Sequence, residues 1–330
     1  MSLRKTLPVL AAALALAAFP VRAQDNSSDP DVATKLVDTM NKLFGQHAGF
    51  RANHAKGVVA TGTFVGAPEA ASLSRASLFL GAKIPVVVRF SDATGLPAVP
   101  DGAGDANPHG LAVKFKLPDG SETDMVTNSL PFFPVRTGEE FLALLTAVGS
   151  SPKDAPKPTP LETFVASHPS VPAALGALRT PDSFLHEQYN GVNAFILVNK
   201  DGARQAARYV FAPREVVHLE AADAAQKPAD FLADDLAARL RQGPGTFTLK
   251  AQLAEPGDDI LDGSKPWPKE RKLVTLGTLT IEALSPDSLE AQKKLLFLPG
   301  ALTDGIEPSG DPLVDVRDGA YAVSFARRNP

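Results

Sequence analysis

Two short segments, far apart in the sequence, carry residues that can bind and transform a small molecule. The first is Arg51-Ala52-Asn53-His54-Ala55-Lys56-Gly57, where polar and cationic residues crowd ahead of a strand-like alternation. The second is Arg317-Asp318-Gly319-Ala320-Tyr321, in which the arginine and the tyrosine share a face if the segment is helical. A histidine moves protons near neutral pH, and a tyrosine can serve as an anionic metal ligand. Taken alone, the first segment fits a solvated turn better than a catalytic site, and the second fits an exposed surface pair better than a metal ligand.

The composition excludes several other kinds of site. The chain has no cysteine, which rules out disulfides, thiolate ligation of haem, iron–sulfur clusters and cysteine-type zinc sites. Its six histidines lack the HExxH spacing of zinc hydrolases, and no GxSxG, Walker A or GxGxxG motif is present. The formal net charge is −4, so we expect no nucleic-acid partner.

The N-terminus has the pattern of an export signal. Arg4 and Lys5 precede an apolar run over residues 7–19, and Val21-Arg22-Ala23 follows with small or apolar residues at the cleavage positions. We predict a signal peptide over residues 1–23, cleavage after Ala23 and a periplasmic location. The run is too short for a membrane anchor, and no later segment is long and apolar enough, so we expect no membrane association. Residues 24–33 are polar and are predicted to form a flexible arm.

The remaining sequence predicts an α+β domain over residues 34–330. Strands are predicted at 57–64, 84–90, 111–117, 123–127, 193–198, 205–211, 246–253 and 273–282. Helices are predicted at 34–45, 138–148, around 160–178, 227–241 and 286–295. Pro118-Asp119-Gly120 and Asp201-Gly202 indicate hairpin turns. Because no βαβ alternation is evident, we expect a closed antiparallel barrel of about eight strands with inserted and flanking helices.

Six segments, taken in order, resemble the haem catalase superfamily. The residues that carry the resemblance are Arg51 to Gly57 (R-V-V-H-A-[KR]-G), Arg89-Phe90-Ser91 (R-F-S), 107–117 (D-P-R-G-F-A-V-K-F), 128–136 (N-N-T-P-[IV]-F-F-I-R), 185–197 (R-H-M-N-G-Y-G-x-H-T-F) and Arg317 to Tyr321 (R-x-F-x-Y). The resemblance spans about residues 48 to 328. The short length points to the small catalase-related peroxidases, with a catalase core domain, rather than to full catalases.

The resemblance implies a haem b cofactor and a role for each matched residue. Tyr321 would be the phenolate ligand of the iron, and Arg317 would donate to the phenolate oxygen. On the other face of the haem, His54 would be the acid–base that moves a proton between the two peroxide oxygens. Ser91 would orient His54, and Asn128 would hydrogen-bond the peroxide.

Five further residues are implied to hold the cofactor itself. Arg51, Arg89 and Arg328 would pair with the haem propionates, since a guanidinium matches the geometry of a carboxylate. Phe141 would stack on the porphyrin, and Phe133 would line the pocket. A peroxide substrate and a small reducing co-substrate are the partners that follow.

Four positions depart from the catalase pattern. Asn107 stands where true catalases have a channel acid, His109 replaces the following arginine, Asn53 replaces a branched apolar residue, and Ala93 replaces a valine that narrows the channel. Each change is expected to make the access route wider or differently polarised. We therefore predict a haem-dependent peroxidase that reduces organic hydroperoxides and hydrogen peroxide, with weak catalase activity.

Three other functions fit the same residues. They are a true catalase, an isomerase of fatty-acid hydroperoxides, and a periplasmic barrel that only binds haem or an apolar ligand. A mere carrier has no need of polar His54 and Asn128 at the metal. The absence of the later helical region of catalases argues against NADPH. The sequence leaves open the physiological peroxide, the electron donor and whether the protein forms a homo-oligomer.

Overall fold

The computed structural model describes residues 30–328. The predicted signal peptide over residues 1–23, and most of the predicted arm, lie outside the described residues. The arm prediction is wrong for residues 30–33, because helix α1 already begins at Pro30. Val32 and Ala33 are buried against helix α8, so apolar packing extends the helix toward the N-terminus. A membrane-spanning helix, one both long and apolar enough to cross a bilayer, is not found among residues 30–328.

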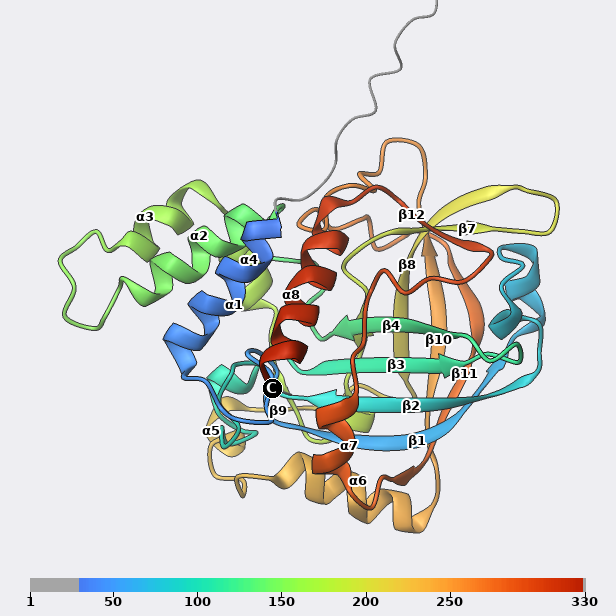
Figure 1. The fold of residues 1–330 in the computed structure, drawn as a ribbon, viewed down its shortest axis with the longest axis horizontal. Coiled ribbons are helices and arrows are strands. Elements are labelled where there is room, and N and C mark those ends of the chain that lie inside the picture. Colours follow the sequence, from blue (N-terminus) through green and yellow to red (C-terminus); the bar gives the residue numbers. More distant parts are fainter. Residues whose placement is uncertain (1–29, 329–330) are drawn as a thin grey trace, which may run out of the picture.

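Eight antiparallel strands close into a barrel, as predicted. They are β10, β11, β1, β2, β3, β4, β6 and β8 in spatial order, and pairing of β8 with β10 closes the ring, while β7 and β12 continue from β8 (Figure 1). The strands of residues 30–328, including those outside the ring, are β1 Gly57–Gly66, β2 Lys83–Ser91, β3 Gly110–Lys116, β4 Glu122–Asn128, β5 Thr180–Pro181, β6 Tyr189–Asn190, β7 Phe195–Val198, β8 Arg204–Pro213, β9 His218–Leu219, β10 Gly245–Leu253, β11 Leu273–Leu284 and β12 Ile306–Pro308.

The hairpin that joins β3 to β4 shows how local sequence fixes the strand register. Gly120 has a φ of 86°, a left-handed conformation that glycine adopts without steric cost. The Asp119 carboxylate accepts a hydrogen bond from the backbone N–H of Ser121 at 2.9 Å. The turn sets Lys116 opposite Glu122 and, at the other end of the hairpin, Gly110 opposite Asn128.

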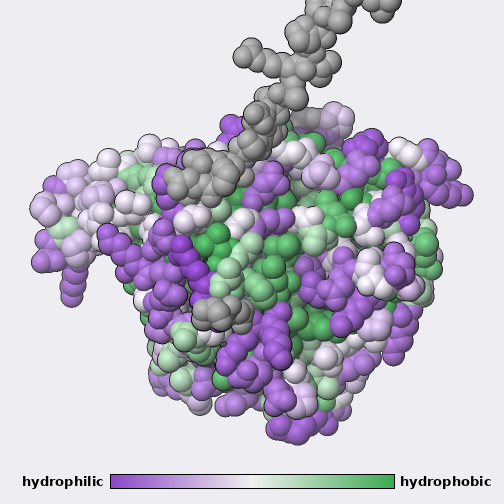
Figure 2. All heavy atoms as spheres, in the orientation of Figure 1, coloured by the Kyte–Doolittle hydropathy of each residue, from purple (hydrophilic) through white to green (hydrophobic). Residues whose placement is uncertain are grey.

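The helices gather mainly on one side of the barrel. They are α1 Pro30–Phe44, α2 Gly138–Gly149, α3 Pro160–Ser167, α4 Ser170–Gly176, α5 Ala221–Ala224, α6 Phe231–Gln242, α7 Ser288–Lys294 and α8 Pro312–Arg328. Helices α1, α2 and α8 pack together through small apolar clusters, with α3 and α4 outside them (Figure 1). Figure 2 shows a hydrophobic area on this face over α8 and the segment that follows α7.

Strand alternation gives the barrel wall two different faces near β2, β3 and β4. The inward set includes Phe90, Leu111 and Val113, which are fully buried in the barrel core. The neighbours of these residues along each strand face outward, toward helix α8. The outer wall at the ends of these three strands, covered by helices, is therefore where a site can form without disturbing the core.

Candidate active site

One cavity lies between the outer barrel wall and helices α1, α2 and α8. Its volume is about 1210 Å³, including the open space at its mouth. All ten site residues predicted from the sequence line it: Arg51, His54, Arg89, Ser91, Asn128, Phe133, Phe141, Arg317, Tyr321 and Arg328. The fold thus brings together segments that are up to 277 positions apart in the sequence.

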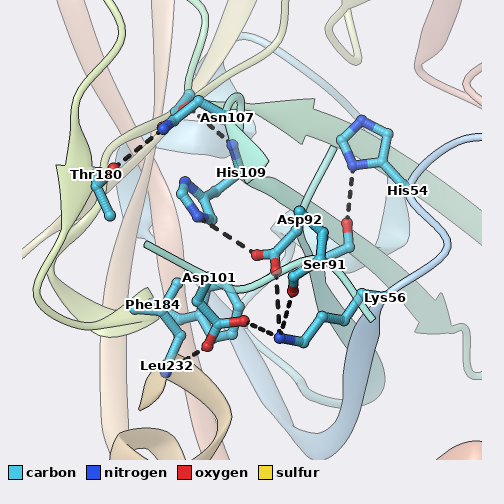
Figure 3. A network of polar contacts seen from close by, with 12 residues as sticks. His54, Lys56, Ser91, Asp92, Asp101, Asn107, His109, Thr180, Phe184 and Leu232 are labelled. Atoms are coloured by element: carbon cyan, nitrogen blue, oxygen red, sulfur yellow. Dashed lines mark hydrogen bonds and ion pairs between the residues drawn. The ribbon is translucent and has the colours of Figure 1, made fainter. Parts of the chain in front are cut away.

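His54 points into the cavity from the loop ahead of β1. Its backbone is left-handed, with a φ of 53°, which for a residue other than glycine costs about 1–3 kcal/mol and is found mainly at functional sites. Its Nδ1 lies 3.1 Å from the Ser91 hydroxyl (Figure 3). Burial, and then the positive charge of Arg89, lower the pKa of His54 to about 3. The imidazole is therefore neutral at neutral pH and can accept a proton.

Three neighbouring strands present the residues around His54 in one row. Ser91 at the end of β2 is paired with Gly110 at the start of β3, which is paired with Asn128 at the end of β4. A Cβ on Gly110 would lie 2.7 Å from the Ser91 hydroxyl and 3.2 Å from His54 Nδ1, so only glycine lets the ring approach. The Asn128 side-chain oxygen accepts a 2.9 Å bond from the N–H of Leu130, which directs its NH₂ group as the donor toward a ligand.

Tyr321 and Arg317 stand one turn apart on helix α8, on the other side of the cavity. The guanidinium donates to the Tyr321 hydroxyl oxygen from Nε at 3.3 Å and from Nη2 at 3.2 Å. The third nitrogen, Nη1, donates to the Asn193 side-chain oxygen, and Asn193 in turn donates to Asp311 at 2.7 Å. Sequence reasoning assigned no role to Asn193, although the residue lies within a recognised segment.

Two buried arginines, Arg89 and Arg328, and the half-buried Arg51 form a cationic edge of the cavity. Arg51 and Arg328 both donate to the backbone carbonyl of Leu295, at 2.8 Å and 2.6 Å, and Arg89 donates to the side-chain oxygen of Gln292. Burial lowers the pKa of Arg89 to about 9 and that of Arg328 to about 10, and it also lowers the pKa of Arg51. Among the described residues, no carboxylate lies within 4.0 Å of these guanidinium groups. The edge can therefore take up anionic groups of a ligand. The sequence offered no signal for Gln292.

The rest of the lining is apolar. Phe133 and Phe141 meet edge to face, with ring centroids 5.1 Å apart. Val37 and Met40 of α1 and Leu313 of α8 complete this wall. Within residues 30–328, no cluster of three or more histidine and carboxylate side chains can hold a bare metal ion. The donor set instead suits a flat apolar group with anionic substituents and one axial tyrosine ligand.

Three of the positions that depart from the catalase pattern lie outside this lining. Asn107 donates to the Thr180 hydroxyl at 3.1 Å, Ala93 is buried, and the His109 side chain is 0% exposed. The fourth, Asn53, does line the cavity. The prediction that these positions widen an access route stays a prediction.

Comparison with known proteins agrees with this site. The family model for catalase matches residues 32–329. The chain belongs to the catalase family. Two relatives named catalase-related peroxidase are similar over nearly their whole length. The one from Mycolicibacterium paratuberculosis (strain ATCC BAA-968 / K-10) is 37% identical, covering 91% of this chain and 94% of the relative. The one from Synechococcus elongatus (strain ATCC 33912 / PCC 7942 / FACHB-805) is 34% identical, covering 89% and 88%.

A solved structure of a bacterial catalase has the same fold. It superposes with a TM-score of 0.76 at 24% identity, covering 89% of this chain and 60% of the catalase. The shared fold therefore extends over most of this chain and over 60% of the catalase.

Proposed function

We propose that this catalase-family protein is a haem b-dependent peroxidase. It reduces organic hydroperoxides and hydrogen peroxide with electrons from a small donor, and it disproportionates hydrogen peroxide weakly. The observation that carries the proposal is the single cavity in which Tyr321 with Arg317 on one side meets neutral His54 with Asn128 on the other. The names of the two relatives from Mycolicibacterium paratuberculosis and Synechococcus elongatus support the peroxidase assignment.

The residues present fit a haem. Arg89 and Arg328 are buried cations, Arg51 is half-buried, and none of the three has a carboxylate partner; two propionates would supply the missing charge. The cavity runs between the strand ends that carry Ser91 and Asn128 and the helix that carries Tyr321, and its lining is mainly apolar, as in cofactor sites. Tyr321 would hold the iron, and Phe133 and Phe141 would cover the porphyrin. When bound, the haem supplies the redox chemistry that cleaves the peroxide O–O bond.

The protein side chains handle the proton and orient the substrate. Neutral His54 accepts the hydroxyl proton of the incoming hydroperoxide and returns it to the departing oxygen as the O–O bond breaks. Ser91 holds the imidazole at Nδ1, which leaves Nε2 for this exchange. The Asn128 NH₂ group donates to a peroxide oxygen. Arg317 stabilises negative charge on the Tyr321 oxygen through its two hydrogen bonds.

Catalase activity is the second candidate, because the fold and family are those of catalases. Isomerisation of fatty-acid hydroperoxides and simple haem carriage use the same cavity, but neither is favoured by the matched relatives.

Paired assays of the haem-loaded protein separate these functions. Oxygen release from hydrogen peroxide is measured beside oxidation of a dye donor, with hydrogen peroxide and with an alkyl hydroperoxide. We expect donor-dependent reduction of both peroxides and little oxygen. His54→Gln should lower the rate about 10²–10⁴-fold, the usual contribution of an acid–base group, while His168→Gln, outside the cavity lining, leaves it unchanged. Oxygen release at full catalase rates without a donor would refute the peroxidase assignment.

We also propose that residues 1–23 direct export to the periplasm. The basis is the Arg4-Lys5 start, the apolar run and the Val21-Arg22-Ala23 site. Mass spectrometry of the protein from a bacterial periplasmic fraction should find a mature N-terminus at Gln24. Full-length protein confined to the cytoplasm would contradict this proposal.

A further inference from the structure

A second buried polar cluster lies behind the cavity, on the core side of the barrel wall. Asp92 follows Ser91 directly, and His109 precedes Gly110, so strand alternation turns both side chains away from the cavity and into the barrel end. Both are buried, at 1% and 0% side-chain exposure. Figure 3 shows Asp92 between His109 and Lys56. None of these groups takes part in the proposed peroxidase reaction as described above.

The polar atoms of this pair are short of partners. The two carboxylate oxygens of Asp92 and both ring nitrogens of His109 lack a hydrogen bond within the described structure, and the approach of His109 Nε2 to Asp92 Oδ1 is long, at 3.4 Å. Each unpartnered buried polar atom destabilises the fold, because it has lost its hydrogen bonds to water. A pair of apolar side chains would seal the barrel end at lower cost. Unpartnered buried polar groups in a folded protein are therefore candidates for a functional role.

The charges around Asp92 do not balance if its carboxyl group is ionised. Lys56 is shared by Asp101, Asp230 and two backbone carbonyls, and it reaches Asp92 only at 3.9 Å. Asp101 takes the lysine and the N–H of Leu232 as its partners. Burial, reinforced by the negative charge of Asp101, raises the pKa of Asp92 to about 9, and burial lowers the pKa of His109 to about 3. At neutral pH the pair therefore holds one proton.

The pair lies close behind His54. Ser91 and Gly110, the immediate chain neighbours of Asp92 and His109, are the residues that contact the His54 ring. The main-chain carbonyl of Asp92 faces His54, and a positive charge on either histidine disfavours a positive charge on the other. The other titratable or charged groups that act on the pair are Lys56, Asp101, Arg89, Tyr189 and His218.

We propose that Asp92 and His109 form a proton store that supplies His54 during peroxide reduction. The inference rests on the proposed function, because reduction of ROOH to ROH and H₂O takes up two electrons and two protons, whereas disproportionation of hydrogen peroxide takes up none in total. The O–H bond of Asp92 breaks and His109 Nε2, 3.4 Å from Asp92 Oδ1, accepts the proton, while His109 releases its Nδ1 proton to replace the one that His54 delivers to the peroxide. Asp92 is left as a carboxylate near Lys56, and a proton from solvent restores it.

Infrared spectroscopy of the full-length, haem-loaded protein tests the store without relying on activity. We expect a protonated-carboxyl band at neutral pH that disappears as the pH passes about 9. Asp92→Asn should remove the band, and Asp119→Asn, on the exposed β3–β4 turn, should leave it. A spectrum in which Asp92→Asn removes no protonated-carboxyl band at neutral pH overturns the proposal.

The pH profile of peroxide reduction tests the link to His54. Wild-type activity should fall above about pH 9, when Asp92 has lost its proton. The Asp92→Asn variant should reduce peroxide about tenfold more slowly at neutral pH, a loss below the usual range for an acid–base group. Its pH profile should also lack the alkaline limb, the fall in activity above about pH 9. Asp92→Glu should restore the limb, which a purely structural role would not require. An Asp92→Asn profile with the wild-type rate and limb overturns the proposal.

A second variant keeps the proposal testable if the first does not fold. If Asp92→Asn does not fold by circular dichroism, His109→Gln replaces it and should keep the infrared band while slowing the reaction. A His109→Gln protein with the wild-type rate overturns the store. If the wild type shows the band but reduces no peroxide, the proposed function fails together with the supply role, while the shared proton stands.

Discussion

Replacing Gly110 with alanine tests the geometry of the site most directly. The new Cβ would meet the Ser91 hydroxyl at 2.7 Å and the His54 ring at 3.2 Å and 3.3 Å, against an ordinary contact of at least 3.4 Å. The Ser91 oxygen must therefore move by about 0.7 Å and the imidazole by a few tenths of an ångström. Both displacements act on the hydrogen bond of 3.1 Å that holds His54 in place.

The expected loss follows from that displacement. A misplacement of about 1 Å in a catalytic group can cost about 10²-fold in rate, so a shift of this size should lower peroxide reduction by roughly 10- to 100-fold. In free energy this is about 1.4–2.7 kcal/mol of transition-state stabilisation. Haem binding should be unaffected, because Tyr321 and the three arginines do not touch Gly110.

The assay measures haem content by absorbance and peroxide consumption under single-turnover conditions. Gly104→Ala is the matched control, since a Cβ there meets nothing within 4 Å and the residue lies in the same part of the chain. A Gly110→Ala protein with normal haem content and a wild-type rate would falsify the idea that the Ser91–His54 contact positions the acid–base. Equal losses in both variants would point to a general destabilisation instead.

Three further predictions concern haem retention, the tyrosine environment and acid stability. Tyr321→Phe should abolish haem retention, measured by the absorbance of the purified protein, and an unchanged spectrum would show that another residue binds the iron. Asn193→Ala should free one arm of Arg317 and shift the haem absorption spectrum while the protein stays folded; an identical spectrum would contradict a role for this contact. The buried histidines His54 and His109 have pKa values lowered to about 3, so below the unfolded value of about 6.5 only the unfolded chain takes up these two protons. Between about pH 6.5 and 3, each histidine should therefore lower the stability of the haem-free protein to urea by about 1.4 kcal/mol per unit of falling pH. Asp92 opposes one histidine's share, because its raised pKa of about 9 means that only the folded protein holds this proton until the unfolded carboxyl group takes one up near pH 4. His109→Gln should change the net slope by about one histidine's share; equal slopes would refute the low pKa of His109.

The barrel and its main strands were predictable because their signals are local. Alternating Val and Thr at β1, the Pro-Asp-Gly turn before β4 and the Asp-Gly turn before β8 each specify structure within a few residues. That the ten residues meet in one cavity was predictable for a different reason, since all but Phe141 and Arg328 belong to the six ordered segments. The start of α1 was missed because it depends on packing against α8, almost 300 positions later in the chain.

The supporting contacts of the site were not predictable from single residues. Gln292 and Asn193 are ordinary polar side chains in the sequence, and only the fold sets them against Arg89 and Arg317. The pairing of Asp92 with His109 likewise depends on the register between β2 and β3. No propensity scale predicts the left-handed backbone of His54, which is imposed by the surrounding contacts.

The way the barrel closes has a consequence for how the protein is made. Strand β1, near the start of the chain, pairs with β11, whose residues are synthesised more than 200 positions later. Contacts this distant in sequence slow folding, because a long loop must be closed before they form. Helix α8, which carries Tyr321, follows every other helix and strand of residues 30–328. A ribosome-bound or truncated chain lacking α8 would have His54 but not Tyr321, the proposed iron ligand, so haem binding is expected only after α8 has been synthesised.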